Sequence, residues 1–336
     1  MRRLKDGKLK CLIDLHLHLD GSLSLNSVKQ LAQLQNISLP ENDEDIFSLL
    51  RVSKDCPSLN EYLKKFDFPL SLLQTADALT LASKNLLDEL YQQGLQYVEI
   101  RMAPIFHVDK GLSQQEVVEA VLKGMHQSKL KAQLILCLMR QTKDDDIYFE
   151  TINIASKYKN AGVCAIDLAG PEARYATSEY VKYFEYAKKL GVNYTIHTGE
   201  ADGELSIQAA IDMGTQRIGH GVLAYNNPNL LSRLKQKQIP LELCYTSNLH
   251  TRAYNDPYSY PIKEFMNNDI LVTINTDNMS VSNTTIINEY NKIMDNLNLD
   301  LNDIKQLLIN SANAAFVDDN TKQQFINKIN LEFEQL

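Results

Sequence analysis

The sequence lacks several features that would place the protein outside the cytoplasmic, globular class. It has only five cysteines, an odd number without any Cys-x-x-Cys pair, so we expect reduced thiols and no disulfide framework. The longest clean apolar run, residues 134–139, is far too short to span a membrane. The basic N-terminus lacks a secretory apolar segment, because Asp14, His16 and His18 interrupt it at once. We therefore expect a cytoplasmic protein.

An excess of positive charge is also missing. The chain has 34 Lys and Arg against 42 Asp and Glu, a net charge of -8, so it has no general attraction to nucleic acid or to an anionic membrane. Apolar residues make up 44% and charged residues 23%, which excludes a disordered or collagenous chain. These values predict a globular protein that binds a small molecule, and they do not specify an oligomeric state.

No low-complexity tract or Gly/Ser linker divides the chain, so residues 1–336 are expected to form one domain. Short β-rich runs alternate with amphipathic stretches, which predicts a parallel sheet. The candidate strands are 11–15, 97–100, 134–138, 163–168, 193–196, 217–219, 241–244 and 271–274. Eight such units favour a closed (β/α)₈ TIM barrel over an open doubly wound sheet.

The interval between the first two predicted strands is unusually long. It spans roughly 80 residues, far more than one βα unit needs. Helix-like patterns fill it at 24–35, 44–50, 58–65 and 75–91. We therefore expect a helical insertion over about residues 22–92 that covers the barrel mouth. After the last strand, helical patterns at 303–316 and 321–333 are expected to complete the outer ring.

Histidines and carboxylates gather at the ends of the predicted strands. His16 and His18 lie at positions i and i+2 of the first strand, so both imidazoles point to one face and can reach one metal ion. Three further strand ends carry His197 with Glu200, His220, and Asp277. Each of these residues alone would be an ordinary loop or capping residue. Together they are significant, because a barrel brings all four strand ends to the same face.

The donor set indicates the chemistry. Three neutral imidazoles and one carboxylate suit Zn²⁺ or Fe²⁺ and leave a position for water. Such a metal lowers the pKa of its water toward about 7, which favours hydrolysis. A two-metal barrel hydrolase would usually need a bridging ligand, commonly a modified lysine on the fourth strand, but residues 163–168 contain no lysine. One metal per chain is therefore expected.

Six short motifs follow one another from the first strand to the last. They are HLHLDGS (16–22), DLAG (167–170), HTGE (197–200), IGHG (218–221), TSN (246–248) and NTD (275–277). In this order and spacing they resemble the motifs of the adenosine deaminase family. The resemblance implies an eight-stranded barrel that holds one Zn²⁺ per chain and removes the purine 6-amino group by hydrolysis.

The resemblance also implies roles for individual residues. The zinc ligands would be His16, His18, His197 and Asp277. Glu200 would be the catalytic proton donor to purine N1, and His220 would orient or deprotonate the attacking water. Water attack at C6 breaks the aromaticity of the purine, so protonation of N1 by a carboxylic acid is what the reaction needs.

The substrate would be bound by His18, Asp20, Gly170 and Asn278. In the family pattern, the N–H of Gly170 would bond purine N3 and Asp20 would hold the ribose 5′-hydroxyl. Two positions depart from the commonest family pattern. The family often has an aspartate where this chain has Asn278, and a proline where it has Tyr245. An asparagine can still donate to purine N7, so Asn278 is compatible with activity.

The expected function is deamination of adenosine and 2′-deoxyadenosine in purine salvage. Asp20 favours a nucleoside, because adenine-specific relatives tend to carry glutamate there. An AMP deaminase would need a cationic phosphate cradle, which the motif loops lack although the helical insertion could supply one. Adenine, AMP or another 6-aminopurine derivative remain alternative substrates, and an inactive nucleoside-binding barrel is an alternative class that the intact set of ligands, acid and base argues against.

Two further pairs of residues have a structural interpretation. Glu99 and Arg101 lie at i and i+2 of the second strand, where they form either a buried ion pair that supports the site or simple barrel filling. Ser247 and Asn248 belong to a family motif, and we expect them to brace the metal ligands.

Overall fold

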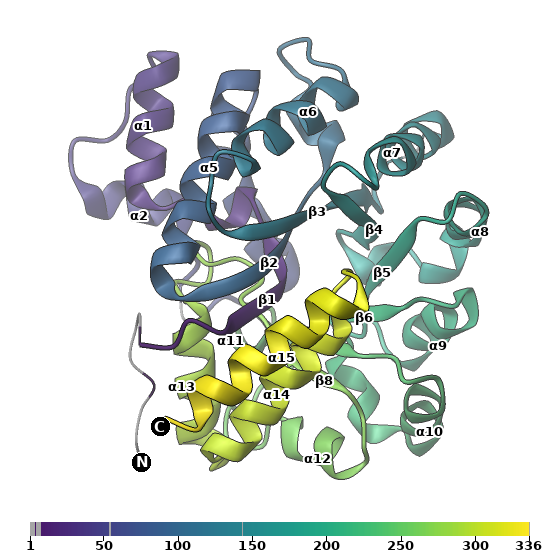
Figure 1. Ribbon diagram of the computed structural model, residues 1–336. Coiled ribbons are helices and arrows are strands. Elements are labelled where there is room, and N and C mark those ends of the chain that lie inside the picture. Colours follow the sequence, from purple (N-terminus) through teal and green to yellow (C-terminus); the bar gives the residue numbers. More distant parts are fainter. Residues whose placement is uncertain (1–3, 5–7, 54, 143, 336) are drawn as a thin grey trace.

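Eight parallel strands form the centre of the computed structural model, which describes residues 4, 8–53, 55–142 and 144–335. The strands are β1 Leu12–His18, β2 Leu95–Met102, β3 Lys131–Met139, β4 Val163–Ala169, β5 Asn193–Thr198, β6 Arg217–His220, β7 Leu241–Leu243 and β8 Val272–Ile274. They pair in sequence order, and the circle is nearly closed where His18 N–H donates to the carbonyl of Asp277 at 2.7 Å, just beyond β8. The predicted (β/α)₈ barrel is therefore confirmed (Figure 1).

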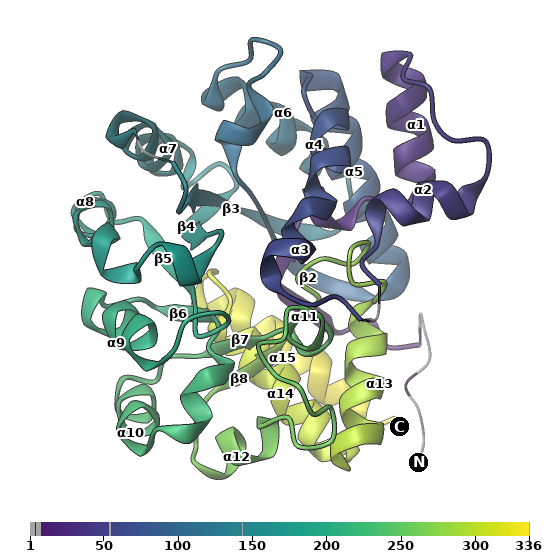
Figure 2. The ribbon, with the colours of Figure 1, turned by 180° about the vertical axis from the view of Figure 1, so that it is seen from behind.

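Helices connect the strands and follow the last one, and most of them surround the strands on the outside of the barrel (Figure 2). They are α1 Leu25–Gln35, α2 Asp43–Leu50, α3 Leu59–Leu63, α4 Asp67–Leu72, α5 Ala76–Gln93, α6 Gln114–Met125, α7 Asp145–Tyr158, α8 Val181–Lys189, α9 Glu204–Met213, α10 Pro228–Lys237, α11 Tyr245–His250, α12 Ile262–Asn267, α13 Ile286–Leu297, α14 Leu301–Ala314 and α15 Asp319–Phe333. Local capping sets their ends. Ser113 and Glu116 form a capping box at the start of α6, and Gly94 ends α5 with a φ of 98°.

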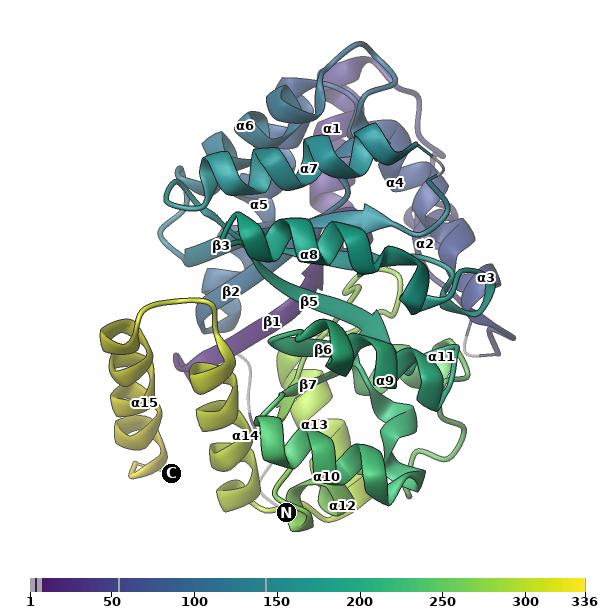
Figure 3. The ribbon, with the colours of Figure 1, turned by 90° about the vertical axis from the view of Figure 1, so that its right-hand side faces the viewer.

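The long interval after β1 contains helices α1 to α5. Helix α5 packs against β2 and α6, as a ring helix of the barrel does, so α1 to α4 are the part that exceeds one βα unit. The short helix α3, the 3₁₀ turn Lys64–Phe66 and α4 lie at the carboxyl ends of the strands (Figure 3). This placement is compatible with the expected cover over the barrel mouth.

The last two helices have different positions. Helix α14 packs against β8 and β1 in the outer ring, as expected. Helix α15 lies instead over the amino end of the barrel, opposite α3 (Figure 3), where the ring of Phe325 stacks 5.1 Å from that of Tyr97 at the start of β2. Among the described residues, no helix is long and apolar enough to cross a membrane, and all five cysteines are free thiols.

The barrel interior is charged rather than purely apolar. Arg101 bonds Glu242 at 2.9 Å and Asp167 at 2.8 Å, while Arg217 bonds Glu99 at 2.5 Å and Glu242 at 2.6 Å. All five side chains are at most 1% exposed. Glu99 and Arg101 therefore pair with facing strands rather than with each other, because side chains two residues apart on one strand lie on successive levels of the barrel.

Candidate active site

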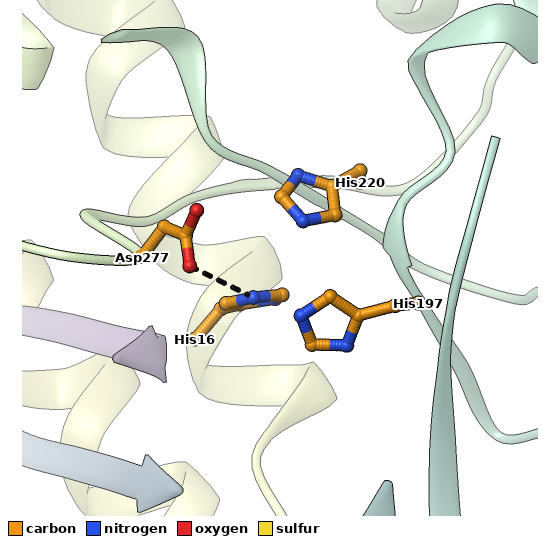
Figure 4. A group of neighbouring side chains, drawn as sticks. All are labelled: His16, His197, His220 and Asp277. Atoms are coloured by element: carbon orange, nitrogen blue, oxygen red, sulfur yellow. Dashed lines mark ion pairs between the residues drawn. The ribbon is translucent and has the colours of Figure 1, made fainter. Parts of the chain in front are cut away.

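The predicted site residues meet at the carboxyl ends of four strands. Figure 4 shows His16 of β1, His197 of β5, His220 of β6 and Asp277, after β8, directed toward one another. Each offers one ligand atom, and these atoms lie within 4.8 Å of one another. This arrangement is a buried group of three imidazoles and one carboxylate that can hold a metal ion.

His18 reaches the same group from the end of β1. Its Nε2 lies 3.3 Å from Nε2 of His197 and 3.4 Å from Oδ1 of Asp277. Four imidazoles and one carboxylate therefore converge, one imidazole more than the predicted ligand set contains. Both His18 and His220 are near enough to bind a metal ion at this group. The hydrogen bonds that each ring makes indicate which of the two is the ligand.

The surroundings keep three of these imidazoles, those of His18, His197 and His220, in the neutral form that binds metals. Although burial and Arg101 lower it, contacts with the carboxylates of Asp277 and Glu242 raise the pKa of His16. Burial holds the pKa of His18 and of His220 well below the ordinary value, and neighbouring imidazoles push in the same direction. Burial also lowers the pKa of His197. Although burial opposes it, contact with His16 keeps the pKa of Asp277 far below the usual range, so this carboxylate is ionised. The donor set is therefore chemically suited to a divalent cation.

Four of these five groups are each held by a further side chain outside the cluster. Nδ1 of His16 lies 2.8 Å from Glu242, and Nδ1 of His197 lies 2.8 Å from Asp167. The hydroxyl of Ser247 donates to Oδ2 of Asp277 at 2.6 Å, and Nδ2 of Asn248 lies 3.0 Å from Nδ1 of His220. Ser247 and Asn248 thus lie where we expected them. The sequence reasoning missed Glu242 and Asp167, although a lone carboxylate in an apolar strand was an available signal.

The ring orientations follow from these contacts. Since Nδ1 of His16 faces Glu242, its Nε2 faces the centre of the group, and this buried nitrogen has no hydrogen-bond partner. Nδ1 of His220 faces the amide of Asn248, whose oxygen accepts from the hydroxyl of Tyr260 at 2.7 Å. The amide therefore donates to Nδ1, and the proton of neutral His220 lies on Nε2.

Two of the site residues have an unusual backbone. His220 and Asp277 both adopt left-handed conformations, with φ values of 60° and 61°. A residue other than glycine costs about 1–3 kcal/mol in such a conformation, and such strain persists where the surrounding structure imposes it. The sharp turn at each strand end aims the side chain inward, toward the cluster.

A cavity beside the cluster holds the other predicted residues. Asp20, Gly170, Glu200 and Asn278 all line it. Its apolar lining consists of Leu59, Tyr62, Phe66, Leu70, Ala103, Phe106, Cys137, Met139 and Ala169. The first four come from the α3–α4 part of the insertion. Among the described residues that line this cavity, none is a lysine or an arginine.

Two carboxyl groups that line the cavity, those of Glu200 and Asp20, have raised pKa values. Burial, followed by the charges of Asp277 and Glu172, raises the pKa of Glu200 to about 8. Its Oε2 lies 3.6 Å from Nε2 of His220. Burial raises the pKa of Asp20 to about 7, although the N–H of Gly21 donates to its carboxylate at 3.1 Å. A carboxylic acid that is protonated near neutral pH can serve as a proton donor.

Asn278 is packed in a defined orientation. Its Oδ1 is buried against Gly21, where a Cβ atom would lie only 1.8 Å from that oxygen. Only glycine is therefore compatible with this packing at position 21. Asn278 lines the cavity, and its side-chain amide carries a nitrogen that can donate hydrogen bonds.

A (β/α)₈ barrel with imidazoles and a carboxylate clustered at the carboxyl ends of its strands has the architecture of a metal-dependent hydrolase. The family described as adenosine deaminase matches residues 11–331, and the chain belongs to this family. The adenosine deaminase of Haemophilus ducreyi is 43% identical over 333 residues, which cover 96% of this chain and 97% of that protein.

Solved structures of related barrels superpose closely on the chain. The adenine deaminase of Arthrobacter aurescens has a TM-score of 0.86 at 22% identity, with 96% of this chain and 98% of that chain covered. The Arabidopsis protein ADAL, in a complex with IMP, has a TM-score of 0.85 at 25% identity, with 96% and 97% covered. The fold is thus shared by proteins with different purine ligands, and the lining of the cavity must decide the substrate.

Proposed function

We propose that the chain is an adenosine deaminase that converts adenosine and 2′-deoxyadenosine to inosine and 2′-deoxyinosine with release of ammonia, as a cytoplasmic enzyme of purine salvage. One observation carries the proposal: a buried carboxyl group, Glu200, with a pKa raised to about 8, lies beside a metal-binding group in a cavity without cationic lining among its described residues. The name of the relative from H. ducreyi supports the same activity.

One Zn²⁺ ion per chain is the proposed cofactor. Its ligands would be His16, His18, His197 and Asp277. The unpartnered Nε2 of His16 and the low pKa of His18 support binding of a cation at this group. When bound, zinc supplies hydroxide at neutral pH by lowering the pKa of water toward about 7. His220 would have a different role, because the proton on its Nε2 leaves that nitrogen without a lone pair for a metal ion.

The chain's own residues supply the remaining chemistry. Glu200 would give its proton to purine N1, so that negative charge does not accumulate on the ring when oxygen bonds to C6. His220, with its proton on Nε2, would donate a hydrogen bond that orients the attacking oxygen. The C6–N6 bond then breaks as the proton of the new C6 hydroxyl passes to the amino group, which leaves as ammonia while C6 becomes a carbonyl. The proton released by the attacking water would return to the carboxylate of Glu200. His220 would therefore orient the water rather than deprotonate it.

The substrate would be fixed at its edges by three groups. The N–H of Gly170 would bond N3, and the amide nitrogen of Asn278 would donate to N7, which is an acceptor in neutral adenine. Asp20 would accept the ribose 5′-hydroxyl, and His18 would also lie against the substrate. The apolar lining from α3 and α4 supports a further proposal, that the helical insertion covers the bound nucleoside and belongs to a single catalytic domain.

A nucleoside fits the cavity better than a nucleotide. The 5′-phosphate of AMP would need charge-assisted hydrogen bonds, and the described lining residues include no lysine or arginine to make them. Above its pKa of about 7, the carboxylate of Asp20 would in addition repel a phosphate. Free adenine would leave Asp20 without its hydroxyl partner.

A substrate panel tests the proposal. The purified protein is supplied with zinc and assayed with adenosine, 2′-deoxyadenosine, adenine and AMP at equal concentrations, and both ammonia and the purine product are measured. We expect the two nucleosides to react fastest, with about one Zn²⁺ per chain by elemental analysis. Faster reaction of adenine or AMP would overturn the substrate assignment. Stoichiometric metal without any deamination would instead indicate a nucleoside-binding barrel.

A further inference from the structure

A buried carboxylate outside the cavity holds the loop that carries Glu200. Glu172 follows β4 in the 3₁₀ turn Glu172–Arg174, and it is 2% exposed. Four consecutive backbone N–H groups of residues 199–202 donate to its two oxygens, at 2.7, 3.1, 2.8 and 3.1 Å. The hydroxyl of Ser206, in the first turn of α9, is a fifth donor at 2.6 Å.

These bonds matter because the loop has no regular structure of its own. Residues 199–203 connect β5 to α9, and their backbone groups belong to neither element. Gly199 adopts a left-handed conformation with a φ of 71°, which starts the sharp turn. The carboxylate of Glu172 therefore provides the partner that a helix or a strand would otherwise provide. The position of the Glu200 backbone depends directly on this contact.

A chain of hydroxyl groups connects Glu172 to a buried cation. Arg140 at the end of β3 donates to Thr177 Oγ1 at 3.0 Å, which lies 2.6 Å from Ser206 Oγ. The same guanidinium nitrogen donates to the carbonyl of His197 at 2.6 Å. The order Arg140, Thr177, Ser206, Glu172 lets every group donate to the next, from the positive end to the negative end. The network thus links the ends of β3, β4 and β5.

We propose that Glu172 is a positioning residue for the deamination, which fixes the Gly199–Asp202 loop so that the carboxyl group of Glu200 is held at purine N1. The inference rests on the proposed function for the role of Glu200, but the contacts of Glu172 are independent of it. Glu172 does not line the cavity. Its effect on the reaction passes through Glu200, whose misplacement by about 1 Å can cost about 10²-fold in rate.

The substitution Glu172→Gln tests the proposal. In glutamine, an NH₂ group replaces one of the two carboxylate oxygens. The N–H or O–H groups that donate to that oxygen in the wild type then face another donor, so some of the five hydrogen bonds must be lost. We expect kcat for adenosine to fall about 10- to 100-fold, with KM changed by less than about threefold and zinc content unchanged. The control is Glu179→Gln, an exposed residue a few positions further on, which removes the same charge and should leave kcat unchanged.

A double mutant separates positioning from general structural support. If Glu172 acts through Glu200, Glu172→Gln should cause no further loss of kcat in a Glu200→Gln background. A loss that multiplies with that of Glu200→Gln, or an unchanged kcat in the single variant, would overturn the proposal. If Glu172→Gln does not fold, Ser206→Ala replaces it, because this change removes only one of the five donors. A smaller loss with the same lack of additivity is then expected.

Amide hydrogen exchange gives a readout that needs no catalysis. In the wild type, the N–H groups of residues 199–202 should be protected, and Glu172→Gln should make them exchange faster while Glu179→Gln leaves them unchanged. Unchanged protection would overturn the role of Glu172 even in an active enzyme. Faster exchange in a protein that deaminates none of the purines would refute only the proposed function.

Discussion

Nδ1 of His16 lies 2.8 Å from Oε2 of Glu242, so that Nε2 of the same ring is directed toward Asp277. The carboxylate fixes the tautomer of the ring and makes Nε2 a better ligand. Glu242 is itself held by Arg101 and Arg217, and all three are buried. The charged barrel interior thus orients a proposed zinc ligand.

The first prediction concerns zinc affinity. Glu242→Gln removes the charge that faces His16 and weakens the orientation of its ring, so we expect the affinity for Zn²⁺ to fall about 10- to 100-fold. Competition with a chelating dye measures this affinity at a temperature where circular dichroism finds the variant folded. The exposed Glu264→Gln serves as the charge-matched control. Equal affinity of both variants would show that Glu242 does not support the metal.

The second prediction separates His18 from His220. Asn248 donates to Nδ1 of His220 and leaves the proton on Nε2. Among the described residues, no amide donates in this way to His18, whose Nε2 faces Asp277 and His197. We therefore expect His18→Ala to lose most of its zinc and His220→Ala to keep most of it while turnover falls. Elemental analysis of the dialysed variants measures the difference. The reverse pattern would make His220 the ligand and would change the assignment of both residues.

The third prediction concerns pH. Burial, with Asp277 and Glu172 adding to it, raises the pKa of Glu200 to about 8, so the group is protonated below that pH and can donate its proton. We expect kcat/KM to fall as the pH rises past about 8, or past a lower value if the charge of a bound cation lowers this pKa. Measurement of kcat/KM from pH 6 to 10 tests the expected fall at high pH.

Glu200→Gln should retain zinc and lose about 10²-fold or more in kcat. Near-normal turnover of Glu200→Gln would exclude Glu200 as the acid.

The sequence was sufficient to predict the barrel and most of the cluster. The period of two in HLH places His16 and His18 on one face, and the topology of the barrel brings His197, His220 and Asp277 to the same end. These expectations depend only on strand geometry. They need no knowledge of how the side chains pack.

The supporting contacts could not be predicted in the same way. Arg101 pairs with Asp167 and Glu242 from strands far away in sequence, and the choice depends on which side chains occupy one level of the barrel. Glu172 lies two residues after the DLAG motif without any sequence signal of its role, because that role arises from the path of the 199–202 backbone. Such contacts depend on loop geometry, for which the sequence has no periodic signal.

The last prediction concerns the choice between nucleoside and free base. Asp20 lies in the 3₁₀ turn Asp20–Ser22 directly after β1, is 6% exposed and lines the cavity past the proposed metal ligands. A ribose hydroxyl would be a natural donor to this carboxylate, and free adenine would leave it unpaired, at a cost of about 1–3 kcal/mol. Since about 1.4 kcal/mol is a factor of ten, we expect kcat/KM for adenosine to exceed that for adenine at least about tenfold. Asp20→Ala should reduce this ratio mainly by a loss with adenosine, whereas Asp319→Ala, an exposed residue of α15 at the opposite end of the barrel, should leave it unchanged. Equal kcat/KM values for the two purines in the wild type would mean that Asp20 does not recognise the ribose, and the assignment of a nucleoside as the preferred substrate would fail.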